Sequence, residues 1–336
     1  GIPGDKIPIR ASIYQKQFLT KMTNLNLNRM TNMRHFVLSL LLCCWCGIAF
    51  SCDKAESAPK EESAESQWRN LSFTLATWNV AFDNPVPWDD RKAMVASVFE
   101  TQDFDIIGIQ EPWRHALDDL IAMLPDYDYT GTSVTGDPAD TDCHNNPIFY
   151  KKERFTLLDS GSFWFSETPD IPGSKSWDSY GIRMCNWGKF RDKQTGGEFF
   201  LFNTHFDHKG ETARQKTAQI VNERVKSIAK GYHAFLTGDF NGDQWSEPYK
   251  ILTDQFRDTR DEAVRTESAD WHSYNAYNYS DKPLYSGAQL DHIMLRPADL
   301  DFVVNEWRIV NTDFNKVYPS DHFPIVLSFS FKFERQ

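Results

Sequence analysis

The stretch that decides the fold is Ala234-Phe235-Leu236-Thr237-Gly238-Asp239-Phe240-Asn241, an apolar run that ends in Gly-Asp-Phe-Asn. A short apolar run bounded by polar residues predicts a buried strand. Four other polar phrases follow apolar runs in the same way: Trp78-Asn79 after 73–77, Gln110-Glu111 after 106–109, Asn203-Thr204-His205 after 199–202, and Ser320-Asp321-His322 after a less regular run at 310–317. Strand ends are rigid supports, so we expect these side chains to project into one cleft.

The polar phrases share one kind of chemistry. They supply hard oxygen ligands and imidazoles without a thiolate: Asn79, Glu111, Asp239, Asn241, Asp321, His205 and His322. This set suits Mg²⁺ or Mn²⁺ and phosphate ester hydrolysis better than zinc or serine chemistry. Each phrase alone also has an ordinary explanation: a strand-end turn at Asn79, a helix N-terminal charge at Glu111, a core imidazole at His205.

The order WN, QE, NTH, GDFN, DH and SDH resembles the endonuclease/exonuclease/phosphatase superfamily of deoxyribonuclease I-like proteins. The resemblance runs from about Phe73 to Phe331. It implies a metal-dependent hydrolase acting on phosphate ester bonds, with an active cleft along one edge of a central β-sandwich. The implied fold is α/β: a four-layer α/β sandwich with two central, mostly antiparallel sheets flanked by helices.

The residue pattern supports this architecture independently. It predicts strands at 73–80, 105–110, 148–152, 156–165, 183–191, 198–205, 233–239, 290–296, 302–310 and 325–333. Helices are predicted at 88–99, 115–124 and 212–230. Such a succession indicates two sheets packed face to face with helices outside. We assign residues 71–336 to a single catalytic domain.

The resemblance also implies roles for individual residues. Glu111 would bind the metal ion with Asn79 and Asp321, while Asp239 and Asn241 would orient the attacking water and a phosphate oxygen, or hold a second metal. His322 would contact the phosphoryl group, with Asp291 fixing its tautomer. His205 would stabilise the transition state or assist the leaving group.

One position departs from the deoxyribonuclease-like pattern. Those relatives carry a Glu that pairs with the histidine at the position of His205, whereas this chain reads Cys143-His144-Asn145-Asn146-Pro147. Asn146 or Asn145 would be a neutral partner, and an amide holds an imidazolium less well than a carboxylate does. Asn146 and Arg183 are candidate substrate ligands, because a guanidinium can clamp phosphate. A surface salt bridge is the alternative for Arg183.

Net charge bears on the substrate. The chain carries 36 Lys and Arg against 47 Asp and Glu, and residues 53–336 carry 30 basic and 46 acidic side chains, a net −16. This disfavours generic DNA binding and favours a small or lipid-linked phosphate ester, such as a sugar or inositol phosphate. The alternatives are a secreted nuclease acting on DNA or RNA, since nucleic acid remains open as a partner, and a catalytically weak binding lipoprotein. We expect a monomer.

A second cluster of side chains lies at residues 271–279, where Trp and Tyr alternate with Asn and His. Aromatic rings next to hydrogen-bonding groups can stack a sugar, inositol or base. The alternative is a loop that packs on the end of the sandwich.

The N-terminal region indicates export. Met33-Arg34-His35 precedes the apolar run 36–50, which is too short to span a bilayer comfortably and fits a secretory signal over residues 33–52. Its ending resembles a bacterial lipobox, so lipidation is expected at Cys52, followed by a flexible tether at 53–70. Residues 1–32 are interpreted as a non-native or unstructured extension. The expected location is the cell envelope, on the periplasmic or cell-surface side of a bacterial membrane, with the lipid anchor as the only membrane contact. The alternative interpretation of the apolar run is a helix buried in the core of the protein.

Export would place Cys143 and Cys185 in an oxidising compartment. The resemblance places their strands near one another, so we expect a disulfide between them. Two separate buried thiols are the alternative.

Overall fold

The computed structural model describes residues 68–82, 85–283 and 287–334. The predicted signal peptide, the lipidation candidate Cys52 and the tether as far as Gln67 lie outside this range. Strand β1 (Trp68–Asn79) begins inside the segment assigned to the tether. Within the described residues, no helix combines the length and apolar character needed to cross a bilayer.

The first sheet has the strand order β10-β12-β13-β1-β2-β4-β3. Its other strands are β2 (Ile106–Gln110), β3 (Tyr127–Thr130), β4 (Ile148–Lys151), β10 (Ala263–Glu267), β12 (Phe302–Ile309) and β13 (Ile325–Glu334). Only the β1–β2 and β10–β12 pairs are parallel among the pairings of this sheet.

The second sheet has the order β5-β6-β7-β8-β11-β9. It contains β5 (Phe155–Trp164), β6 (Met184–Asp192), β7 (Glu198–His205), β8 (Ala234–Asp239), β9 (Arg257–Asp258) and β11 (Asp291–Arg296). Its neighbours pair antiparallel except β7 and β8. The prediction of two mostly antiparallel sheets is therefore confirmed.

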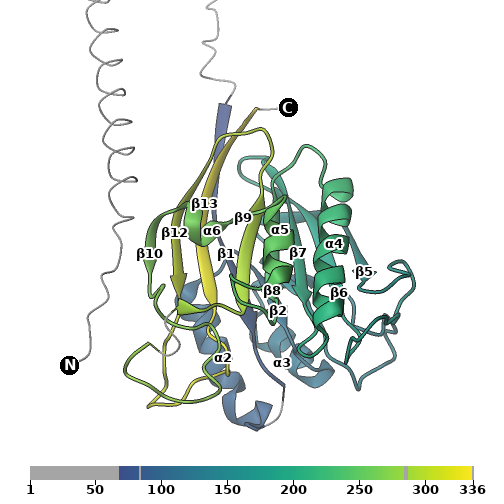
Figure 1. Ribbon diagram of the computed structural model, residues 1–336. Coiled ribbons are helices and arrows are strands. Elements are labelled where there is room, and N and C mark those ends of the chain that lie inside the picture. The colour runs from purple at the N-terminus through teal and green to yellow at the C-terminus, as the bar shows by residue number, and fades with distance from the viewer. Residues whose placement is uncertain (1–67, 83–84, 284–286, 335–336) are drawn as a thin grey trace, which may run out of the picture. The chain divides into compact units, whose positions relative to one another are not determined.

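Alternation along the strands produces the layers (Figure 1). In β7, Phe199 and Leu201 face the core between the sheets, whereas Phe200 and Phe202 face an outer core. That outer core is covered by α4 (Glu211–Ile228) and α5 (Glu247–Thr253). The opposite outer core lies between the first sheet and helices α2 (Trp88–Gln102) and α3 (Arg114–Met123). Alternate residues of the strands are thus buried on opposite faces, and each helix buries one apolar stripe. The result is a four-layer order: helices, first sheet, second sheet, helices.

Gly108 in β2 lets the two sheets approach each other. A Cβ at this position would lie 2.4 Å from both Asn203 Oδ1 and Thr237 Oγ1 of the facing sheet. Asn203 uses the space to join the sheets: its Nδ2 donates to Ile109 O at 2.8 Å, and its Oδ1 accepts from Gln110 Nε2 at 2.7 Å. Asn203 and Gln110, found in two of the polar phrases, are therefore buried structural residues.

The disulfide prediction is wrong. Cys143 and Cys185 are both free and buried. Their side chains enter different apolar clusters: Cys185 packs in the outer core under α4, and Cys143 packs with Val134, Trp164 and Met184. A shared strand neighbourhood does not bring two side chains together when they leave the sheet toward different cores.

The pattern also missed several short elements: β3, β9, β10, α5 and the single-turn α6 (Thr259–Glu262). Their sequences are short and mixed in polarity, so no periodic signal distinguishes them from loops.

Candidate active site

Four strands end at the same edge of the sandwich. Asn79 ends β1 and Gln110 ends the parallel strand β2; His205 ends β7 and Asp239 ends the parallel strand β8. Because parallel neighbours present their carboxyl ends together, their terminal side chains meet as predicted.

Asp291 and His322 reach this edge from the opposite direction. Asp291 begins β11, which is antiparallel to β8, and it pairs directly with Asp239. His322 lies before β13, which is antiparallel to β1. The expectation that Ser320-Asp321-His322 follows a strand is therefore wrong, since the phrase precedes one. An antiparallel neighbour brings its amino end to the edge where β1 ends, so the phrase still enters the site.

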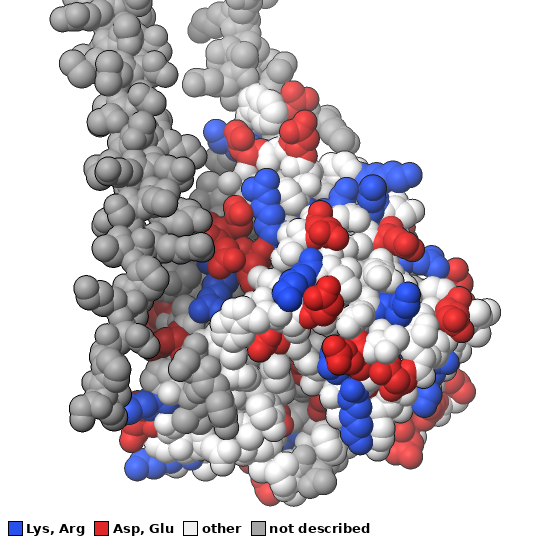
Figure 2. Space-filling view, viewed as in Figure 1, with Lys and Arg blue, Asp and Glu red and all other residues white. Residues whose placement is uncertain are grey.

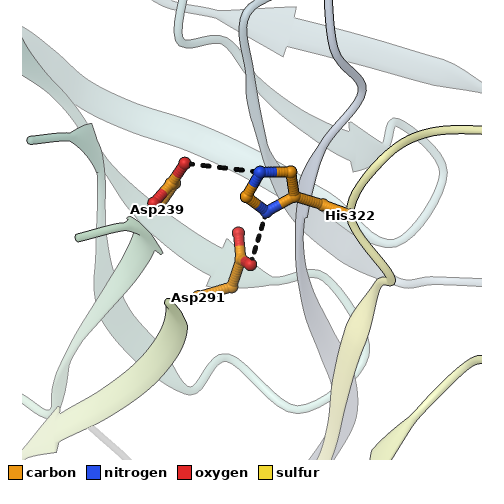
Figure 3. Close-up of side chains that lie close together, drawn as sticks. All are labelled: Asp239, Asp291 and His322. Carbon is orange, nitrogen blue, oxygen red and sulfur yellow. Dashed lines mark hydrogen bonds and ion pairs between the residues drawn. The ribbon is translucent and has the colours of Figure 1, made fainter. Parts of the chain in front are cut away.

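The centre of the site is formed by Asp239, Asp291 and His322 (Figure 3). His322 Nδ1 lies 2.7 Å from Asp291 Oδ2, so this nitrogen carries the hydrogen and donates it. The opposite nitrogen, Nε2, points toward Asp239 Oδ2 at 3.7 Å. Asp291 thereby fixes the tautomer of His322, as the resemblance implies.

The three groups shift one another's pKa values. Burial and the negative charge of Asp291 raise the pKa of Asp239 to about 7. Burial alone would lower the pKa of His322, but Asp291 and Asp239 together raise it well above its ordinary value. The site therefore concentrates negative charge around one imidazole.

Asn79 holds two carboxylates in place. Its Nδ2 donates to Glu111 Oε1 and to Asp239 Oδ2, both at 3.1 Å. Its Oδ1 accepts from the amide of Ala81 at 2.9 Å. Both polar atoms of the Asn79 amide are thus engaged within the protein, so Asn79 positions the two acids. Glu111 and Asp239 are left as the oxygen ligands for a metal ion on this side of the site.

Glu111 and Asp321 are two partly buried acids that belong to the same site. Glu111 has a backbone φ of 69°, an uncommon conformation for this residue type. Burial raises the pKa of Glu111, and the charge of Asp321 raises it further. The hydrogen bond from Asn79 lowers this pKa but does not outweigh burial. A bound cation would offset both effects that oppose the ionisation of Glu111.

His205 has a different partner from the one expected. Its Nε2 lies 3.0 Å from Asn241 Nδ2, and Asn145 instead donates to Pro112 O. The side chain of Asn146 is fully buried and makes no hydrogen bond with the described residues. Burial and the positive charge of Arg183 lower the pKa of His205 well below its ordinary value, so this imidazole is neutral.

Arg183 is a buried cation, so the surface salt bridge is not its role. Its Nη2 donates to His208 Nδ1 at 3.2 Å, and its Nε is 3.7 Å from Asp207 Oδ2. Burial would raise the pKa of Asp207, but backbone amides of Gly210, Gly181 and neighbouring residues lower it below its ordinary range. Asp207 thus anchors the loops around Arg183, and the guanidinium is fixed beside the acids.

The aromatic stretch 271–279 mainly supports the centre. Ser273 Oγ accepts from the amides of Leu290 and Asp291 at 2.8 and 3.0 Å, and Ser273 O accepts from Phe323 N. Trp271 packs on Phe323. One residue therefore connects the backbones on both sides of the Asp291–His322 pair. A serine inside an aromatic run gives no sequence signal for this function.

Arg91 of α2 orders the segment beside Asn79 and Glu111. It is fully buried and donates to the carbonyls of Val80, Ala81 and Phe82. The amide of Phe82 in turn donates to Glu111 Oε2 at 3.2 Å. A buried guanidinium that satisfies several carbonyls holds this irregular strand end in one conformation.

The donor set fits a divalent cation that prefers oxygen. In the described part of the chain, Asp239, Asp291 and His322 bring ligand atoms within 4.8 Å of one another. Glu111 and Asp321 add carboxylates next to them. No cysteine belongs to this group of described residues, and burial, with the charges of neighbouring carboxylates, raises the pKa of Asp239 and of Glu111. Mg²⁺ or Mn²⁺ matches this set better than a thiophilic metal.

Comparison with known proteins identifies a family with this fold. The model of the Endonuclease/Exonuclease/phosphatase family matches residues 76–322. A solved protein of that family from Bacteroides thetaiotaomicron is 33% identical, with a TM-score of 0.71 over 79% of this chain and 96% of that one. A mannosyl-6-phosphatase from the same organism is 32% identical, with a TM-score of 0.68 over 77% of this chain and 99% of that one. An uncharacterised protein of Acanthamoeba polyphaga mimivirus is 25% identical, over 75% of this chain and 96% of that one.

Proposed function

Because this chain belongs to the endonuclease/exonuclease/phosphatase family, we propose that it hydrolyses a small phosphate ester with the aid of Mg²⁺ or Mn²⁺. The observation that carries the proposal is the pair His322–Asp291, joined at 2.7 Å and facing Asp239 among further carboxylates. Such a pair binds a phosphoryl oxygen and holds a proton, and the acids bind a cation.

The residues divide the work by their chemistry. A divalent cation held by Glu111, Asp321 and Asp239 would neutralise phosphate charge and polarise the ester. His322 donates from Nδ1 to Asp291, which leaves Nε2, 3.7 Å from Asp239 Oδ2, to contact the phosphoryl group. Asp239, whose Oδ2 lies 3.7 Å from His322 Nε2, would hold the cation or orient the attacking water. Asn79 keeps Asp239 and Glu111 oriented.

Three findings favour a small, phosphorylated carbohydrate-like substrate. The chain from residue 53 onward carries a net charge of −16, which disfavours extended contact with a polyanion. On the face seen in Figure 2, Lys and Arg are interspersed with Asp and Glu and form no continuous basic surface. The 32% identical mannosyl-6-phosphatase supports a sugar phosphate, with inositol and lipid-linked phosphates as the next classes.

A substrate panel tests the proposal. Sugar phosphates, inositol phosphates, sphingomyelin and plasmid DNA are assayed with Mg²⁺ and again with excess EDTA. We expect phosphate release from a small ester, abolished by EDTA and restored by added Mg²⁺. Preferential cleavage of plasmid DNA would replace the proposal with a nuclease. Binding without turnover of any compound would indicate a binding protein of the same fold, the reading suggested by the missing carboxylate at Asn146.

We propose further that the protein is exported and anchored to the bacterial cell envelope through lipidated Cys52. The basis is the sequence alone, since Cys52 lies outside the described residues. In a bacterial host, Cys52→Ala should shift the protein from the detergent phase to the aqueous phase, or trap it as a precursor. Unchanged detergent partitioning of the variant would contradict the anchor.

A further inference from the structure

His205 and three side chains near it carry buried polar atoms that have no hydrogen-bond partner in the described part of the protein. The atoms are His144 Nδ1, both side-chain polar atoms of Asn146, Arg183 Nε and His205 Nδ1. Asn146, His205 and Arg183 are 0, 2 and 7% exposed. Unpaired buried polar groups are costly, and a cluster of them at an active site indicates a group that arrives from outside. We call these four residues the polar subsite.

Several contacts place the four residues together. The rings of His144 and His205 are 6.1 Å apart between centroids. Burial lowers the pKa of both imidazoles, and the nearby charge of Arg183 lowers both further. Asn186 of β6 donates to Asn146 O at 3.0 Å, and it pairs with Asn203, which precedes His205 by two residues.

Hydrogen bonding fixes what His205 can offer. Asn241 Nδ2 donates to Phe206 O at 3.1 Å, which sets the orientation of the amide. The same nitrogen faces His205 Nε2, so Nε2 accepts and Nδ1 carries the hydrogen. His205 Nδ1 and Asn146 Nδ2 are therefore buried donors without a partner in the described residues, whereas Arg183 Nε lies 3.7 Å from Asp207 Oδ2 and contributes mainly its charge.

We propose that the polar subsite binds an unesterified oxygen of a terminal phosphate group, which makes the enzyme selective for phosphate monoesters over diesters. The inference rests on the proposed phosphoesterase function and defines its substrate class. A terminal phosphate presents an additional anionic oxygen that accepts from His205 Nδ1 and Asn146 Nδ2 and is attracted by the charge of Arg183. In a diester a carbon substituent occupies that position, and the buried donors would stay unpaired. Sites built to hydrogen-bond a substrate group discriminate strongly against analogues that lack it.

A matched pair of substrates tests the selectivity. p-Nitrophenyl phosphate and bis(p-nitrophenyl) phosphate release the same chromophore, and kcat/KM is measured for both with Mg²⁺. We expect the wild-type enzyme to prefer the monoester, and Asn146→Ala to lower the monoester-to-diester ratio at least about tenfold. The control is Asn222→Ala, another buried Asn with an unpartnered Oδ1, located on α4. An unchanged ratio in Asn146→Ala would overturn the subsite.

A second variant and a binding measurement keep the test decisive. His144→Phe retains a ring of similar shape and removes both nitrogens, so it serves if Asn146→Ala does not fold; it too should lower the ratio. Inorganic phosphate is titrated by calorimetry with Mg²⁺ present, and either variant should bind it at least about tenfold more weakly than wild type. Equal affinities of wild type and variants for inorganic phosphate would overturn the subsite, whether or not the aryl esters are hydrolysed. Failure to hydrolyse either aryl ester would count against the proposed function and not against the subsite.

Discussion

Glu111 combines a strained backbone with a carboxyl group whose ionisation its surroundings oppose. Such features persist when a residue is retained for function. We predict that Glu111→Gln lowers kcat at least about a hundredfold, since the variant loses the charge that binds a cation, and His322→Ala should lose as much. The melting temperature of Glu111→Gln should stay level or rise, because like-charge repulsion with Asp321 is removed.

Steady-state kinetics and thermal melts of the same preparations measure both effects. Glu247→Gln, at the start of α5, is the control and should keep wild-type activity. Near-normal turnover of Glu111→Gln or His322→Ala in folded protein would contradict the site assignment.

Asp291 determines how His322 responds to pH. Its carboxylate raises the pKa of His322, which burial alone would lower. If protonated His322 binds the phosphoryl group, activity is present below the pKa of His322 and lost as pH rises through it. Asp291→Asn lowers that pKa, so the alkaline limb of the kcat/KM profile should move to lower pH, with a loss of roughly tenfold or more at neutral pH.

Complete pH–rate profiles of wild type and Asp291→Asn test this prediction. An alkaline limb at the same pH in both proteins would show that the pair does not govern the reaction.

At the scale of elements, the contact between the two sheets depends on Gly108. A methyl group there would collide with Asn203 Oδ1 and Thr237 Oγ1, both at 2.4 Å, and both belong to the buried hydrogen bonds that join β2, β7 and β8. We predict that Gly108→Ala destabilises the protein by about 3 kcal/mol, through overpacking and disrupted hydrogen bonds. Urea unfolding monitored by fluorescence measures the change.

Gly196→Ala is the matched control. No atom lies within 4 Å of a Cβ at Gly196, and its φ of +83° is the only source of strain. The control should cost about 1 kcal/mol. Equal losses in the two variants would mean that the close approach of the sheets is not what Gly108 provides.

At the scale of the whole molecule, buried neutral histidines make the fold sensitive to acid. His233 packs on Phe302, Phe329 and Phe331, and its Nδ1 accepts from Ala298 N at 3.1 Å. Burial lowers the pKa of His233 from 6.5 to about 4. Between these pH values the unfolded chain binds the proton and the folded chain does not, so stability falls as pH decreases through this window.

We predict that His233 alone accounts for roughly 3 kcal/mol of the stability lost between pH 6.5 and pH 4. In His233→Gln that component should be absent, while the other buried histidines still contribute. Denaturant unfolding at several pH values measures the slope, with the exposed His115→Gln as control. A slope in His233→Gln as steep as that of wild type would contradict the account.

The sequence by itself determined the strands that carry the site, because an apolar run followed by a polar phrase is a local pattern. It also determined the ligand chemistry, since Glu111, Asp239, Asp321 and His322 are oxygen and imidazole donors wherever they lie. The order of the phrases was enough to identify the architecture, which the structure and the family match confirm.

Only the tertiary structure decided which side chains meet. The pairing of Asp291 with Asp239 depends on β11 lying antiparallel beside β8, a long-range contact. The same holds for Asn203, which belongs to one of the polar phrases but joins the two sheets, and for His205, whose partner is Asn241. It holds also for Cys143 and Cys185, which face separate cores. Local sequence fixes a residue's chemistry and its place on a strand. The facing element, distant in the chain, fixes its partner, because side-chain contacts follow from sheet order and register.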